Sequence, residues 1–153
     1  MMYSQEKIET VLPHRAPFLF AREVEVIEAG KLGRATVQLT AVDNYWQGEA
    51  GLAPQQSADV LLLESAAQVF GVILASGVEA ELAASGKKPA DGKHLLLGFD
   101  NCDIAGDLYA QPELQLDVAL DGVFGSMFKG SFIATTGERL LARGELIVMQ
   151  GEA

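Results

Sequence analysis

Two functional side chains, a carboxyl and an amide, interrupt a long apolar segment near the middle of the chain. Glu64 and Gln68 lie four residues apart in VLLLESAAQVFGVIL, residues 60–74. On a helix this spacing places both side chains on one face, one above the other. A carboxylate among apolar side chains is costly unless its pKa rises or a neighbour donates a hydrogen bond to it. Gln68 could be that neighbour, so the pair indicates either a buried polar contact that fixes helix packing or part of an acid–base site.

A second carboxylate, Glu49, lies in YWQGEA, residues 45–50, a short distance before the apolar segment. If Glu49 faces the same apolar interior, the two carboxylates cannot both ionise cheaply and would titrate as a pair. One of them could then accept a proton while the other donates one. If Glu49 points into solvent, it needs no compensation and takes no part in the chemistry. The residues alone leave both outcomes open.

The apolar segment predicts a long helix from about residue 57 to residue 76, ended by Gly77. Apolar residues occur on every side of this helix, so other elements must enclose it. A shorter helix is expected between the N-cap residue Ser4 and Pro13, and residues 79–93 are expected to form a frayed turn followed by a loop.

Six segments alternate apolar and polar residues, as strands with one buried face do. They are residues 18–28, 32–40, 94–104, 113–121, 126–136 and 139–149. An antiparallel sheet of about six strands curling around the helix satisfies both patterns, which predicts an α+β class and a single domain over residues 1–153. One sheet cannot cover every side of a helix, so we expect a dimer or a larger oligomer.

The composition excludes several classes of function. A formal charge of −10 argues against a nucleic-acid partner, because phosphate binding needs a concentrated positive surface. The apolar run is too short and too interrupted to cross a bilayer, and no basic leader with a cleavage site is evident, so no membrane association and a cytoplasmic location are expected. Cys102, the one cysteine, is expected to pack at a strand end. His14 and His94 lack ligand-spaced neighbours, so neither a metal site nor a cofactor is expected.

Three motifs carry a resemblance to a known family. LPHRAPFLFAREVEVIE at 12–28, YWQGEA at 45–50 and VLLLESAAQ at 60–68 resemble the successive signatures of 3-hydroxyacyl-acyl carrier protein dehydratases of the hotdog fold. That family has an LPHRYPFLL opening, an FF-x-GHFP turn and a helix reading PGVLI-x-EALAQ. The similarity continues through GFDNCDI at 98–104 and GSFIATTGERLLARGELIV at 130–148. It implies a hotdog domain that acts on acyl thioesters in fatty acid or polyene-type biosynthesis.

The resemblance also implies roles for individual residues. In the family, the GHFP histidine takes the C2 proton of the substrate and the helix carboxylate protonates the departing hydroxyl. These roles place Glu64 as the acid and Gln68 as its orienting neighbour, while Glu49 stands at the histidine position. This chain therefore departs from the family at its base. Asp59 also replaces the glycine that opens the family helix, and Ala58 replaces the proline before it.

Further substrate-binding residues follow from the same motifs. Tyr45 and Trp46, with Gly48, would wall the acyl tunnel. Gly98 would let a backbone approach the helix or the acyl chain. His14, expected chiefly as a hydrogen-bonding residue, and the cations Arg15 and Arg22 are candidates for contact with the carrier arm or an acidic carrier protein.

The implied substrate is a thioester of acyl carrier protein or CoA. Two alternatives remain beside the dehydratase. One is a non-catalytic, carrier-binding partner in a heteromer with an active dehydratase, and the other is an acyl thioesterase. The LPHRAPF opening favours the dehydratase.

Overall fold

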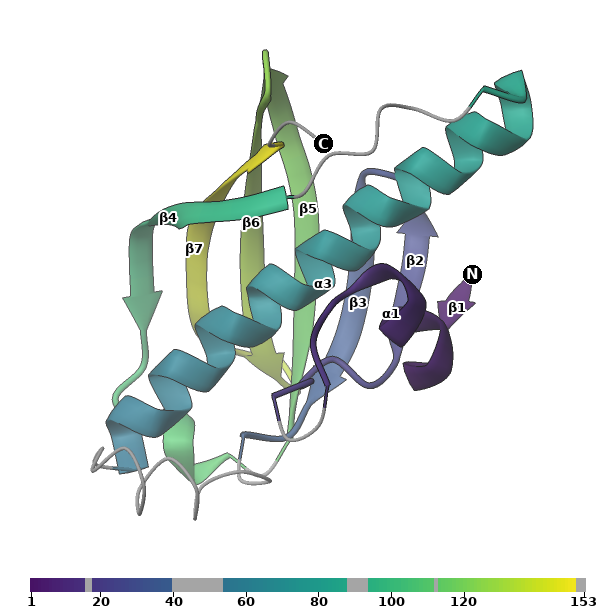
Figure 1. Cartoon of the computed structure of the whole chain (residues 1–153). Coiled ribbons are helices and arrows are strands. Elements are labelled where there is room, and N and C mark those ends of the chain that lie inside the picture. The colour runs from purple at the N-terminus through teal and green to yellow at the C-terminus, as the bar shows by residue number, and fades with distance from the viewer. Residues whose placement is uncertain (16–17, 40–53, 88–93, 112, 151–153) are drawn as a thin grey trace.

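The computed structural model describes residues 1–15, 18–39, 54–87, 94–111 and 113–150. A long helix, α3 (Pro54–Ser85), crosses one face of a sheet that has seven strands in the described residues (Figure 1). The strands are β1 (Met2–Tyr3), β2 (Val24–Glu28), β3 (Leu32–Val37), β4 (His94–Ile104), β5 (Leu114–Phe124), β6 (Met127–Thr136) and β7 (Arg139–Gln150). Their order in the sheet is β1-β2-β3-β5-β6-β7-β4, and neighbouring strands pair antiparallel. The expected α+β class is confirmed.

The sheet forms because its strands bury alternate side chains under α3. In β5, for example, Leu114, Leu116 and Val118 are buried, whereas Gln115 between them is exposed. Phe70 and Ile73 of α3 are fully buried in the same core. β4 lies at one edge of the sheet and pairs only with β7 among the described strands. The edge position leaves its outer backbone groups without a neighbouring strand among the described residues.

Two strand predictions needed correction. β1 was missed because two residues are too short to show alternation, and its pairing with β2 raises the expected six strands to seven in the described residues. The segment from Phe18 to Glu23 was expected to be part of a strand, but β2 begins at Val24. Apolar spacing in that segment reflects its contact with α3, described below, and not a sheet ladder.

The central helix is longer than the sequence predicted. α3 continues through Gly77 to Ser85, so the expected stop at Gly77 and the frayed turn after it are wrong. A Cβ at Gly77 would lie 2.8 Å from the Cα of Gly30, so the glycine is there to let α3 pass close to the β2–β3 turn. The helix ends before Gly86, whose φ of +69° suits glycine at a helix C-terminus.

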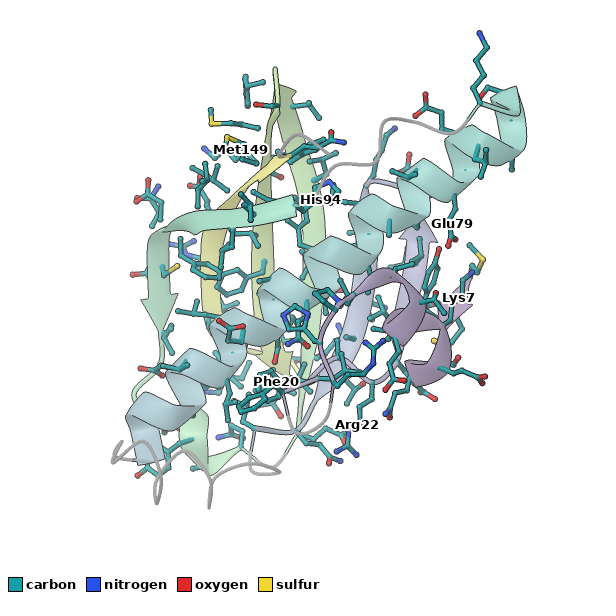
Figure 2. All side chains as sticks on the ribbon, in the orientation of Figure 1. Lys7, Phe20, Arg22, Glu79, His94 and Met149 are labelled. Atoms are coloured by element: carbon teal, nitrogen blue, oxygen red, sulfur yellow. The ribbon has the colours of Figure 1, made fainter. Side chains whose placement is uncertain are left out.

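The first helix, α1 (Gln5–Val11), forms as expected and joins the chain start to α3. Ser4 caps it by accepting a hydrogen bond from the backbone N–H of Lys7 at 3.3 Å. The hydroxyl of the buried Tyr3 donates a hydrogen bond to the Glu79 carboxylate of α3. Lys7 Nζ lies 3.5 Å from the same carboxylate and 4.0 Å from the Tyr3 ring centroid. Lys7 and Glu79 face each other across this contact in Figure 2. We call Tyr3, Lys7 and Glu79 the tyrosine cluster.

α3 is long and apolar enough to cross a membrane by length and composition, with a mean hydropathy of 1.7 in its most apolar window. The expectation that the apolar run is too short is therefore wrong. The better criterion is burial, since 61% of that window is enclosed within the molecule. α3 is a buried core helix, and its length is not evidence of a membrane protein.

Candidate active site

Gln68 fixes an irregular segment onto the central helix. Its Oε1 accepts hydrogen bonds from the backbone N–H groups of Phe20 at 2.8 Å and Ala21 at 3.2 Å, and its Nε2 donates to the carbonyl of Phe18 at 2.8 Å. Gln68 itself is only 2% exposed. These contacts satisfy backbone groups that no strand pairs. The sequence placed Gln68 as a partner of Glu64, but its hydrogen bonds go to residues 18–21.

A second contact anchors the start of the same segment. Gly71 lies on α3 one turn after Gln68, and a Cβ at that position would lie 2.9 Å from Cδ2 of Leu12. Leu12 therefore packs directly against the helix backbone. The described residues 12–15 and 18–21 are thus held to α3, the first group by Leu12 and the second by the Gln68 hydrogen bonds. We call this stretch the clamped segment.

His14 and Arg15 lie within the clamped segment. The Nδ1 of His14 is enclosed and has no hydrogen-bond partner in the described residues, so the expected hydrogen-bonding role is not seen at that atom. Arg15 donates to the carbonyls of Leu12 at 2.9 Å, His14 at 2.8 Å and Glu9 at 2.9 Å. The guanidinium therefore closes the C-terminal end of α1, and the structure gives it a local structural role.

Glu64 lies one helical turn before Gln68, as the four-residue spacing predicted. It is half-buried, and it makes no hydrogen bond or ion pair within the described part of the chain. Its neighbours along this side of α3 are half-buried too, whereas the opposite side of the helix is buried against the sheet. The half-buried residues are Asp59, Val60, Leu63, Glu64 and Ala67. We call them the open strip of α3.

The open strip shows that the described residues of one chain do not enclose α3 on every side. Val60, Leu63 and Ala67 are apolar but remain partly accessible in one chain. An apolar helix face that its own sheet leaves partly open is suited to a ligand or a second subunit. The strip therefore offers a carboxylate, Glu64, beside an apolar surface.

Several other predicted residues lie elsewhere. Tyr45, Trp46, Gly48 and Glu49 fall outside the described residues. Gly98 is in β4, where a Cβ would meet nothing within 4 Å, so the expected close backbone approach is not found. Gly98 instead lies at a shift in the β4–β7 register, between Leu96 and Gly98, where glycine is common in strands.

The remaining histidine and the cysteine also lie on β4. His94 is exposed, and its ring meets Phe128 edge-on at 5.6 Å between centroids. Partial burial of the ring lowers the pKa of His94. Cys102 is exposed and lies near the end of β4, where a Cβ at Gly144 would lie 2.5 Å from its Sγ. Neither residue lies on the helix that carries Glu64.

A hollow of about 540 Å³ lies beside the clamped segment and the outer side of β2 and β3. Leu19, Phe20, Arg22 and Arg34 are among the residues that line it, and Glu64 is not. Figure 2 labels Phe20, which belongs to the clamped segment, and Arg22, which lies between that segment and β2. Arg34 is paired with Asp117 at 2.7 Å. The hollow and the open strip are therefore separate features.

Comparisons with known proteins show what this chain is similar to in sequence and in fold. No family model matches the chain. Curated relatives include the 3-hydroxyacyl-[acyl-carrier-protein] dehydratase FabZ of Bacillus pumilus, 28% identical over 146 residues that cover 95% of this chain and 94% of the relative. The FabZ of Thermoanaerobacter sp. is 29% identical and covers 95% of each chain. The chain is similar to FabZ over nearly all of its length.

Solved structures show the same fold for this FabZ-like protein. The dehydratase heterocomplex ApeI:P from Xenorhabdus doucetiae matches with a TM-score of 0.62 and 18% identity, over 95% of this chain and 91% of that one. A thioesterase family protein from Silicibacter pomeroyi matches with a TM-score of 0.57 and 11% identity, over 97% and 98%. The expected hotdog fold is confirmed, and the neighbours include both dehydratase and thioesterase proteins.

Proposed function

We propose that this FabZ-like protein is a cytoplasmic 3-hydroxyacyl thioester dehydratase of fatty acid or polyene-type biosynthesis. The observation that carries the proposal is the position of Glu64 on the open strip of α3, one turn from the clamp made by Gln68. Its carboxylate has no partner in the described residues. The full-length similarity to 3-hydroxyacyl-[acyl-carrier-protein] dehydratases supports the substrate class. The substrate would be a thioester of acyl carrier protein or CoA.

In the proposed reaction Glu64 protonates the departing C3 hydroxyl, and a second group removes the C2 proton. Gln68 positions the clamped segment and so shapes the site without touching the reacting atoms. Glu49, Tyr45, Trp46, Gly48 and His14 remain predicted site residues. Arg15 and Gly98 are left out of the proposed site, because Arg15 is occupied by carbonyl groups and Gly98 faces open space.

The proposed assembly joins two protomers through β4. Leu95, Leu96 and Leu97 of this edge strand are 51%, 42% and 52% exposed, so the strand presents apolar side chains as well as free backbone groups. Such an edge is a site for strand pairing with another chain. We expect a second copy of this chain there. A related dehydratase subunit is the alternative, because the structurally similar ApeI:P is a dehydratase heterocomplex.

The non-catalytic carrier-binding partner remains a second candidate because Glu49 stands where the family has its histidine. One assay separates the possibilities. Purified protein is incubated with a 3-hydroxyacyl thioester, and enoyl absorbance and free thiol are followed together. The dehydratase proposal expects enoyl product without thiol release, and Glu64→Gln should abolish it.

Thiol release without enoyl product would establish a thioesterase instead. Absence of both, with retained binding of the acyl thioester in an equilibrium measurement, would establish the non-catalytic partner. Glu81→Gln, an exposed change on the same helix, is the matched control and should leave the activity unchanged.

A further inference from the structure

Leu12 lies on the side of α3 that the open strip follows beyond Glu64. It contacts Gly71, seven residues after Glu64, where a Cβ would lie 2.9 Å from Leu12 Cδ2. Successive helix residues turn by about 100° and rise about 1.5 Å, so Gly71 faces within about 20° of Glu64 and lies about 10.5 Å further along the axis. The half-buried Ala67 lies between them on the same side of the helix. The apolar surface beside Glu64 therefore runs over Ala67 and ends at the side chain of Leu12.

The backbone of Leu12 is fixed on both sides. Its N–H donates to the carbonyl of Ile8 at 2.9 Å, and its carbonyl accepts a hydrogen bond from Arg15 Nη1 at 2.9 Å. Ile8 is fully buried in the core, so the first of these contacts belongs to the packed interior. Pro13 follows and restricts Leu12 to the extended conformation that it adopts, with φ −114° and ψ 145°. Leu12 is thus a rigid stop, and Gly71, without a side chain, leaves the space that it occupies.

An acyl tail beside Glu64 has two directions along α3. Toward the helix N-terminus the strip passes Val60 and reaches Asp59, whose Oδ1 is enclosed without a hydrogen-bond partner in the described residues. An apolar tail laid there would remove more water from this carboxylate, which is costly. Toward the helix C-terminus the strip presents Ala67 and Leu12, two apolar side chains packed against the core. The apolar tail therefore suits the direction that ends at Leu12.

We propose that Leu12 sets the upper limit of acyl chain length at this site, an inference that rests on the proposed dehydratase function. With C3 of the substrate beside Glu64, the tail lies over Ala67 and its end meets Leu12. Nonbonded carbon atoms pack about 4 Å apart, so about 6.5 Å of the strip is free before Leu12. An extended chain advances roughly 1.2 Å per bond, so about five carbons fit beyond C3. The preferred substrate is thus a medium-chain 3-hydroxyacyl thioester of about eight carbons.

The test measures kcat/KM for 3-hydroxyoctanoyl and 3-hydroxydodecanoyl thioesters. We expect the wild type to prefer the octanoyl substrate. Leu12→Ala removes the stop and should raise the dodecanoyl-to-octanoyl ratio of kcat/KM by about 10-fold or more, the discrimination that an apolar pocket exerts on chain length. Leu12→Phe, which extends the side chain over the strip, should shift the preference to the 3-hydroxyhexanoyl thioester. Leu120→Ala, at another half-buried leucine packed against the core, is the matched control and should leave the ratio unchanged.

Loss of stability does not confuse this test, because a ratio of two substrates is independent of the folded fraction. In an active enzyme, equal use of both substrates by the wild type, or an unchanged ratio in Leu12→Ala, overturns the inference alone. A ratio that rises in Val60→Ala but not in Leu12→Ala shows that the tail extends toward the helix N-terminus, and it also overturns the inference. A wild type that forms no enoyl product from any of these substrates overturns the proposed function and this inference together.

Discussion

At the scale of single residues, Gln68 shows how one side chain can organise a site without acting in it. Its amide oxygen and nitrogen are both used by the backbone of residues 18–21, at distances of 2.8 to 3.2 Å. Glu64, one turn away, is left without a partner in the described residues. Gln68 therefore has a structural role, since it holds residues 18–21 against α3, whereas the carboxylate of Glu64 is available for chemistry.

Gln68→Ala should lower the free energy of unfolding by about 3 kcal/mol, because it removes the acceptor of the Phe20 and Ala21 N–H groups and the donor to the Phe18 carbonyl. Urea denaturation measures this loss. Gln115→Ala, a change at an exposed glutamine of β5, is the control and should shift stability by less than about 0.5 kcal/mol. Equal effects of the two changes would show that the clamp does not stabilise the fold.

Tyr3 gives the fold a dependence on alkaline pH. Burial, followed by the contact with Glu79, raises the pKa of Tyr3 above its ordinary value of 10.0. The folded protein then holds this proton while the unfolded chain releases it, so the stabilisation is complete below pH 10 and is lost as the pH rises beyond it. Tyr3→Phe should cost about 1 kcal/mol at pH 7 and flatten the decline above pH 10. Denaturation at several pH values tests this, with the exposed Tyr109→Phe as control.

The residue pattern anticipated Glu64 and Gln68 on one side of a helix, because four-residue spacing is a local property. It could not anticipate where the Gln68 hydrogen bonds go, since Phe20 is 48 residues away in the chain. Asp59 was visible as a departure from the family motif. Its enclosed Oδ1 became evident only when the elements were packed.

At the scale of elements, α3 is the longest feature and the one whose end was misjudged. Gly77 resembles a helix stop in the sequence, yet it is an internal packing position against Gly30. Gly86 is the residue with the left-handed backbone that ends the helix. Two glycines nine positions apart cannot be told apart by residue type, because the difference lies in what each one meets in space.

Gly77→Ala should therefore destabilise the protein by about 2 kcal/mol, although alanine favours a helix over glycine by about 1 kcal/mol. The added methyl group would press on backbone atoms of Gly30 at 2.8 Å, which cannot rotate away. Thermal or urea unfolding measures the change. Gly98→Ala, where a Cβ meets nothing within 4 Å, should be close to neutral. A Gly77→Ala variant more stable than the wild type would contradict the close approach.

At the scale of the whole molecule, the apolar edge strand β4 favours association of two protomers, whereas the negative net charge opposes it. β4 presents three half-exposed leucines to solvent. A protomer with a formal charge of −10 repels its own copies, and β4 adds Asp100 and Asp103 to that edge. Strand pairing at β4 should therefore strengthen with ionic strength, because salt screens repulsion while apolar burial persists. The sequence predicted an oligomer from its all-apolar helix, but the edge strand was recognisable only once the strand order was known.

Leu96→Lys should shift the assembly toward the monomer, because a charge would enter the apolar edge contact. Size-exclusion chromatography with light scattering measures the mass at low and high salt. Leu140→Lys, a change at a leucine of the interior strand β7 that is somewhat more exposed than Leu96, should leave the mass unchanged. If neither change alters the mass of an oligomeric wild type, the interface lies elsewhere.

The tyrosine cluster has a kinetic consequence. Tyr3 and Glu79 are 76 residues apart, so their contact closes a long loop and should form late during refolding. Interactions absent from the folding transition state govern how quickly a native protein opens. Lys7→Met should thus accelerate unfolding in a stopped-flow experiment and leave the refolding rate nearly unchanged. The first residues of the chain would then slow unfolding and so lengthen the lifetime of the folded molecule.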